Sequence, residues 1–337
     1  MEYVVIAYLF LSILLYVVLG GADFGAGIIE LFTSARNKSR TRDTLYRAIG
    51  PIWEANHMWL IITIVILFVA YPLIYAEMSV YLHIPLLVML FGIIARGTAF
   101  VFRHYDAVKD DMQHLYNRIY FASSFITPLF LGIIAGSVIS GHIDHAATSF
   151  ADVYIFSWLN WFSIGVGLFV VALCGFLASV YLIGETDNPE DRRRFINKAR
   201  HMNIAAVASG VYVFITAWID GIPLVNWIFG ATIELIAVIA ASISLVVLWI
   251  LIYSGNAIII RMLAGFQVTM ILLALGYAHF PDFIVVTNGT NLTLMDHRAT
   301  MQTINALGWA LLIGTIFIIP ALFYLYYKFK HKEYPHE

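Results

Sequence analysis

The chain has 337 residues, of which 61% are hydrophobic and only 12% are charged. A soluble core does not need that much apolar surface, so the composition predicts an integral membrane protein. The formal net charge of −2 argues against a nucleic-acid partner. The single Cys174 excludes both an intrachain disulfide and a cysteine-based metal site.

Nine hydrophobic stretches are long enough to cross a bilayer core as helices, which takes about 20 residues each. In chain order we place them near residues 4–30, 53–75, 80–102, 119–140, 157–183, 202–219, 229–253, 257–279 and 304–327. Their continuous hydropathy excludes the short alternating strands of a β-barrel. The connections are short, so we expect an all-α integral membrane protein, a bundle of about nine transmembrane helices forming a single membrane-embedded domain over residues 1–337. The first stretch lacks a basic leader and a cleavage site, so we expect it to be retained.

Lysine and arginine residues gather in alternate connections. Seventeen of the 19 follow the first, third, fifth, seventh and ninth stretches, whereas Arg298 alone lies on the opposite side and Arg96 lies within the third stretch. Cytoplasmic loops carry an excess of basic residues. The count therefore predicts an N-terminus outside and a cytoplasmic C-terminus, the parity that nine crossings require.

The connection Glu185–Phe195 is the most highly charged loop, with the sequence ETDNPEDRRRF. Its Asn188-Pro189 step is typical of a turn followed by the start of a helix. We interpret the loop as a solvated face rather than a binding site.

Four ionisable residues lie where a hydrophobic span is expected: Asp23, Glu54, His57 and Arg96. Such side chains are costly in a bilayer and usually face a partner, a cavity or a proton path. Asp23 and Arg96 each lie seven residues before the charged residue that ends their span, which puts both about 10 Å inside the cytoplasmic boundary at 1.5 Å per residue. Glu54 begins the second span from the same side.

The segment Gly50–Leu60, GPIWEANHMWL, opens the second span. Pro51 suits the first helical position, which leaves Glu54 in the first turn, where the helix dipole favours an anion. His57 follows at i+3 on nearly the same face and can titrate near neutrality. Two interpretations stay open: a proton path from the cytoplasm, or an interfacial acid held by Arg96 beside a tryptophan anchor.

The segment Gly20–Gly27, GGADFGAG, places Gly21 and Gly25 four residues apart. This small-xxx-small pattern is typical of helices that pack closely in membranes. We expect a packing seam there, with Asp23 hydrogen-bonded to a neighbouring helix.

The third span ends with ARGTAFVFRH, Ala95–His104, which contains two arginines. We expect Arg96 to be buried as the counterion of Asp23 or Glu54, and Arg103 to snorkel to the interface.

A haem or metal site is not predicted from the residues of this chain. Of eleven histidines only four lie near spans, His57, His83, His201 and His279, two on each side. A haem with two histidine ligands needs them at matched depth and facing one another, so each is better explained as an interfacial residue. The outer acids do not form a convincing metal site either: Glu77, Asp220 and Glu234.

Five segments, in this order, resemble the subunit II family of cytochrome bd-type quinol oxidases, which includes the cyanide-insensitive oxidases. They are GGADFGAG, GPIWEANHMWL, FVAYPLIYA, ARGTAFVFR and NLTLMDHRATMQTINAL, and they extend from residue 20 to about residue 307. The nine expected spans agree with that family.

The resemblance implies a respiratory heterodimer in a prokaryotic cytoplasmic membrane. In such a complex a haem-bearing subunit I carries two haems b and haem d and oxidises quinol, and O₂ is reduced to water with protons drawn from the cytoplasm. This chain would be the accessory subunit, binding no cofactor of its own, stabilising subunit I and supplying part of the proton path. A small additional subunit is a possible further partner. The competing interpretations are a proton-coupled secondary transporter and a scaffold without a proton role.

The resemblance also carries over to individual residues. Glu54 falls where the family places an acid attributed to a proton channel, Asp23 where the first-helix acid occurs, and Arg96 where the third-helix arginine occurs. Members often have Asp-Gly-Asn where this chain has Glu54-Ala55-Asn56. The charge is kept, but the side chain is one methylene longer.

Overall fold

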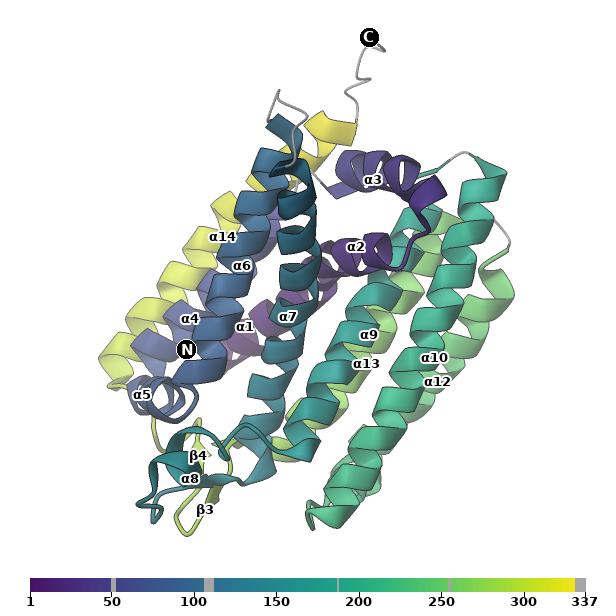
Figure 1. Cartoon of the computed structure of the whole chain (residues 1–337). Helices are drawn as coiled ribbons and strands as arrows, with labels where there is room; N and C mark the ends of the chain where they lie inside the picture. Colours follow the sequence, from purple (N-terminus) through teal and green to yellow (C-terminus); the bar gives the residue numbers. More distant parts are fainter. Residues whose placement is uncertain (50–52, 106–111, 187, 254–255, 331–337) are drawn as a thin grey trace.

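The computed structural model describes residues 1–49, 53–105, 112–186, 188–253 and 256–330. Within these ranges nine helices are long and apolar enough to cross a membrane, which confirms the predicted helical bundle (Figure 1). The first span runs through α1 (Glu2–Leu15), the π-turn η1 (Tyr16–Gly20) and α2 (Gly21–Leu31). The others are α4 (Trp53–Ala70), α6 (His83–Tyr105), α7 (Met112–Ser140), α9 (Trp161–Ile183), α10 (Pro189–Ile219), α12 (Thr232–Leu251), α13 (Ala257–His279) and α14 (Met301–Lys330).

Shorter elements cover the two ends of the bundle. They are α3 (Ala35–Ile49), α5 (Pro72–Tyr81), α8 (Phe150–Tyr154) and α11 (Leu224–Phe229), the parallel pair β1 (Ile143–Asp144) and β3 (Val286–Thr287), and the antiparallel pair β2 (Asp282–Ile284) and β4 (Leu292–Thr293). In Figure 1, α3 lies at the upper end, where α14 finishes, and α5, α8 and the strands lie at the lower end. We call the upper end the basic end; the charge count predicts it to be cytoplasmic.

Several helix boundaries differ from the predicted spans; α7, for example, begins at Met112 rather than near residue 119, and two of the differences have a clear local cause. The second span ends at Ala70 instead of continuing to Tyr75, because Tyr71 leaves the helical conformation (φ −133°) and Pro72 begins α5. The sixth span begins at Pro189 rather than near residue 202. Asn188 caps α10, its side chain accepting hydrogen bonds from the backbone N–H groups of Glu190 and Asp191. The predicted helix start after the Asn-Pro step is therefore confirmed.

The core of the bundle lies around α9. In α9 72% of the most apolar 18-residue window is buried inside the protein, against 6% in α14. Helix α9 is packed between α2, α7 and α10, whereas α14 contacts α1 and α4 from outside. The apolar surface of α14 is therefore left for lipid or a partner chain.

The glycines of the first span lie where α2 meets α9. A Cβ added at Gly25 would lie 1.9 Å from the carbonyl oxygen of Cys174 and 2.7 Å from the Cβ of Ala178. One added at Gly21 would lie 3.3 Å from the Cys174 Sγ. The absence of a side chain at Gly25 therefore lets the two backbones approach, as small residues do in membrane helices.

At the lower end, the segment before α14 contacts the first two spans through an ion pair and a backbone hydrogen bond. Arg298 Nη1 lies 2.9 Å from Glu2 Oε1, and the backbone N–H of Ala299 donates to the carbonyl of Ala70 at 2.7 Å. Tyr71 is fully buried beside this ion pair. Burial raises the pKa of Tyr71 to about 12, with Glu2 adding to the rise and Arg298 opposing it.

Candidate functional site

The centre of the candidate site is an ion pair between Asp23 and Arg96. Arg96 Nη1 donates to Asp23 Oδ2 and Nη2 donates to Oδ1, both at 2.6 Å, and Nη2 also reaches the Asp23 carbonyl at 2.9 Å. Each residue is 1% exposed. The two-pronged geometry suits the planar guanidinium and gives strong, charge-assisted bonds. The sequence left Asp23 and Glu54 as alternative partners of Arg96, and the structure places Asp23 there.

Three helices and a π-turn position this pair. Asp23 lies in the first turn of α2, directly after η1, and single π-turns of this kind are frequent at functional sites. Arg96 extends from α6, and its Nε donates to Ser124 Oγ of α7 at 3.2 Å. The guanidinium also lies 5.2 Å from the ring centre of Phe24 and 5.3 Å from that of Tyr120, within the range of cation–π attraction. Groups from α2 and α7 therefore surround the guanidinium.

His57 lies at the edge of the pair. Its Nε2 is 3.9 Å from Asp23 Oδ2, and its side chain is 16% exposed. Aromatic rings surround the imidazole, with centre-to-centre distances of 6.1 Å to Tyr16, 5.8 Å to Phe24 and 6.3 Å to Trp53. Among the described residues, neither His57 Nδ1 nor the Tyr16 hydroxyl has a hydrogen-bond partner, although both atoms are buried.

Glu54 is separated from this cluster. It lies three residues before His57 in α4, but its side chain is exposed on the outside of the chain. Within the described ranges no hydrogen bond or ion pair joins it to another residue. The structure therefore brings together Asp23, His57 and Arg96 and leaves Glu54 at the surface of the same helix.

A second buried ion pair was missed by sequence reasoning. Arg103 Nη1 lies 3.0 Å from Glu30 Oε2, and Arg42 Nε of α3 lies 2.9 Å from Glu30 Oε1. The prediction that Arg103 snorkels to the interface is wrong, since its side chain is only 2% exposed. Its guanidinium is held inside by Glu30, which is 0% exposed, and by the ring of Tyr120, 4.2 Å away.

The acids and the arginines of the two buried ion pairs have the same spacing along their helices. Glu30 follows Asp23 by seven residues on α2, and Arg103 follows Arg96 by seven on α6, so two helical turns separate both pairs. Tyr120 of α7 contacts both guanidiniums. The equal spacing was visible in the sequence and could have predicted two parallel pairs rather than one.

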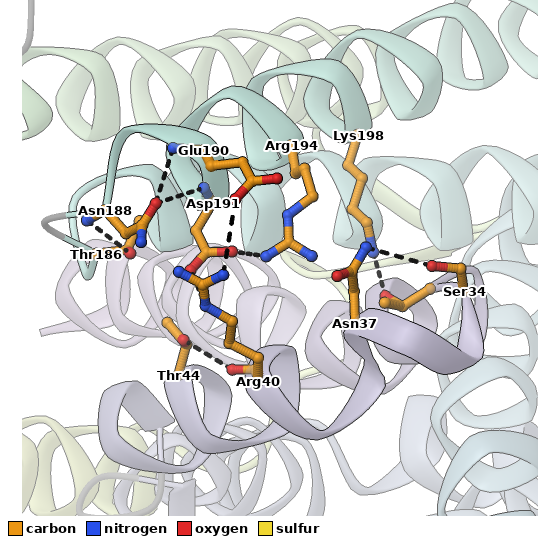
Figure 2. A network of polar contacts seen from close by, with 11 residues as sticks. Ser34, Asn37, Arg40, Thr44, Thr186, Asn188, Glu190, Asp191, Arg194 and Lys198 are labelled. Carbon is orange, nitrogen blue, oxygen red and sulfur yellow. Dashed lines mark hydrogen bonds and ion pairs between the residues drawn. The ribbon is translucent and has the colours of Figure 1, made fainter.

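A charged network joins α3 to α10 at the basic end (Figure 2). Arg40 Nε lies 2.6 Å from Asp191 Oδ2, and Arg194 also contacts Asp191. Lys198 donates to the Ile29 carbonyl at the end of α2, at 2.8 Å. The interpretation of this loop as a solvated face does not hold at Asp191, which is 4% exposed because Arg40 reaches across from α3. The network holds α3 over the end of the bundle.

The histidines do not fit a haem with two histidine ligands inside the described part of this chain. His83 Nδ1 bonds the Val80 carbonyl at 2.9 Å and His279 Nδ1 bonds the Leu275 carbonyl at 2.8 Å. His57 faces Asp23, and His201 is exposed. No two of these four imidazoles are in ring contact with one another, and no group of three His, Cys, Asp or Glu side chains in the described ranges could hold a metal ion.

Comparisons with known proteins point to one family. A family model described as "Cytochrome bd terminal oxidase subunit II" matches residues 1–329. The cytochrome bd ubiquinol oxidase subunit 2 of Bacillus subtilis is 30% identical over 176 residues, covering 51% of this chain and 49% of that protein. The cytochrome bd-I ubiquinol oxidase subunit 2 of Escherichia coli is 25% identical, covering 50% and 44%. The matched segment thus spans about half the length of each of these relatives.

Two further likenesses extend over nearly the whole chain. A putative cytochrome bd menaquinol oxidase subunit II of Bacillus subtilis is 22% identical, covering 96% of this chain and 94% of that protein. A chain of the bd oxidase structure from Geobacillus thermodenitrificans superposes with a TM-score of 0.77 at 18% identity, covering 98% and 99%, which shows a shared fold. Because the family model matches almost the entire length, the chain belongs to the cytochrome bd terminal oxidase subunit II family.

Proposed function

We propose that the chain is the accessory subunit of a membrane-bound quinol oxidase in the cytoplasmic membrane. The match of the subunit II family model to residues 1–329 carries this proposal. In this assembly a haem-bearing subunit I, with haems b and haem d, oxidises quinol and reduces O₂ to water. The present chain stabilises that subunit.

The sharpest test of this assignment is purification of the complex. A tagged chain is expected to retain a haem-bearing membrane subunit, and the optical spectrum of the purified complex should contain separate haem b and haem d bands. Oxygen consumption with a quinol donor should follow the haem content. A haem-free chain that moves protons together with a solute in vesicles would refute the proposal and support a transporter.

Within the complex we infer that Glu54, His57 and Asp23 supply part of a proton route from the basic end. Asp23 accepts two hydrogen bonds from Arg96, which fix the carboxyl group at the inner end of this route. His57 lies 3.9 Å from it and can take up and release a proton. Glu54, exposed three residues earlier on α4, can exchange protons with the surroundings.

Substitution of Glu54 separates the proton role from a structural one. We expect Glu54→Gln to lower quinol-driven oxygen consumption while haem content stays complete. The matched control is Glu190→Gln, which removes an acid that is 80% exposed at the same end and should change neither quantity. Full haem content and full activity in both Glu54→Gln and Glu54→Ala would contradict the proton role. Loss of haem in both would instead assign Glu54 to assembly.

A further inference from the structure

A groove of about 330 Å³ lies between the lower ends of α9 and α10 (Figure 1). Trp161 begins α9 and Asp220 follows the last residue of α10, so these antiparallel helices bring an indole and a carboxylate to the same end. The groove is lined by Trp161, Tyr212, Ile215, Thr216, Ile219 and Asp220. Its volume is within the range of about 300–1,000 Å³ that is usual for small-molecule sites.

The groove runs along α10 over most of one leaflet of the membrane. Asp220 and Tyr212 are eight residues apart, which is about 12 Å along the helix axis. One leaflet contributes about 15 Å to the hydrocarbon core. Trp218 of the same helix is 83% exposed, as is typical of a residue at the membrane interface. The Asp220 end of the groove is therefore level with the lipid headgroups, and the Tyr212 end is level with the acyl chains.

The headgroup end of the groove attracts positive charge. Asp220 is exposed there, and within the described ranges no hydrogen bond or ion pair joins its side chain to another residue. It caps the C-terminus of α10, where the helix dipole adds partial negative charge. The indole of Trp161 is 68% exposed in the same groove, and indole is the aromatic group that attracts cations best. Three separate features thus favour a cation at this position.

The remainder of the groove suits an acyl chain. Ile215 and Ile219 are 50% and 68% exposed. The Thr216 hydroxyl is already satisfied, because it donates to the Tyr212 and Val213 carbonyls at 3.0 Å. The walls between Tyr212 and Ile219 therefore leave little for a polar solute to bind.

The charges of the lower end exclude an anionic lipid as the preferred occupant. No lining residue is a lysine or an arginine. Arg298, the basic residue on this side of the membrane, is already paired with Glu2 at 2.9 Å. A lipid with a net negative headgroup would face Asp220 without a compensating cation, whereas an ammonium headgroup would pair with it.

We propose that the groove between α9 and α10 binds one phospholipid with an ammonium headgroup, of the ethanolamine class. The ammonium group lies against Asp220 and Trp161, and an acyl chain lies along Ile215 and Ile219. This site is separate from the proton role given to Glu54, His57 and Asp23, because none of those residues lines the groove.

Lipid retention by the assembled complex tests whether the groove is occupied. The complex is reconstituted in nanodiscs with equal amounts of phosphatidylethanolamine and phosphatidylglycerol that carry identical acyl chains, and the retained lipids are counted by native mass spectrometry. We expect Ile215→Trp to lose one retained phosphatidylethanolamine per complex, because the indole fills the groove. The matched control is Ile204→Trp, which adds the same side chain at an exposed position of α10 about 16 Å nearer the basic end. The control should retain the wild-type number.

The preference between the two lipids tests the role of the carboxylate. Asp220→Asn keeps the shape of the side chain and removes its charge. We expect the ratio of retained phosphatidylethanolamine to phosphatidylglycerol to fall about threefold, the size expected for one exposed ion pair. The control Asp296→Asn removes another exposed acid at the lower end, outside the groove, and should leave the ratio unchanged.

The results that would overturn the proposal are distinct for its two parts. An unchanged lipid count in Ile215→Trp, or an equal loss in Ile204→Trp, would refute the groove as the lipid site. An unchanged lipid ratio in Asp220→Asn, or a wild-type complex that retains phosphatidylglycerol in preference, would refute recognition of the ammonium group. All counts are made per assembled complex with full haem content, so that a loss of lipid is not a consequence of failed assembly.

Discussion

Removal of one partner from the Asp23–Arg96 pair should cost far more than removal of both. Both residues are 1% exposed, and Arg96 makes four hydrogen bonds to Asp23 and Ser124. Asp23→Ala therefore leaves a buried guanidinium without a counterion, which costs about 3–5 kcal/mol. In the double variant Asp23→Ala with Arg96→Met the unpaired charge is gone, and buried pairs replaced by apolar residues are often close to neutral. We expect the double variant to recover at least half of the loss.

The assay is the free energy of unfolding of the purified complex, measured by titration with a denaturing detergent and followed by helical circular dichroism. The four proteins of the cycle are wild type, each single variant and the double variant. The coupling free energy between the two sites should exceed about 1 kcal/mol. A single variant that loses less than about 1 kcal/mol, or a double variant that is less stable than Asp23→Ala, would refute the reasoning that the pair is a dry, mutually dependent unit.

Three further predictions concern packing and the two ends of the bundle. Gly25→Ala should destabilise the complex by about 1–3 kcal/mol or prevent its assembly, since the new Cβ would lie 1.9 Å from the α9 backbone. The control Gly265→Ala should leave stability unchanged, because its Cβ would lie 3.8 Å from the nearest atom. Equal stability of the two variants would contradict the close packing at Gly25. Asp191→Asn should speed tryptic cleavage within α3, because it weakens the ion pair between Arg40 and Asp191. The free energy of unfolding should change by no more than about 1 kcal/mol, because the Arg40 side chain is 45% exposed. Unchanged cleavage would argue against a role of this ion pair in holding α3. Tyr71 has a folded pKa of about 12 against an ordinary value of 10.0, so its contribution is complete below pH 10 and is lost as the pH rises towards 12. Tyr71→Phe should therefore show a shallower loss of stability over that interval than wild type, in alkaline unfolding titrations, and identical slopes would contradict the burial of the hydroxyl.

The sequence by itself determined the spans and the residues that are unusual within them. Hydrophobic length is a local property, because each membrane helix satisfies its own backbone hydrogen bonds. The nine stretches were therefore found at nearly the right positions, and errors fell at ends governed by caps, such as Asn188, or by a proline, such as Pro72. Ionisable residues inside a span can be recognised equally well from the sequence, because the free-energy cost of placing a charge in the bilayer arises whichever neighbouring residue compensates it. Asp23 and Arg96 were found in this way.

Only the tertiary structure decided which charges meet. Three residues along a helix leave two side chains about 60° apart around its axis. The packing of α4 against the first span decides that His57 lies beside Asp23 while Glu54, on nearly the same face, is exposed. Arg103 was expected at the interface because a long side chain can reach water from that depth. The packing of α2 against α6 instead supplies Glu30 within 3.0 Å, so the charge is satisfied inside the protein. The rotation and tilt of one helix against another depend on contacts between distant segments, and no single stretch of sequence contains them.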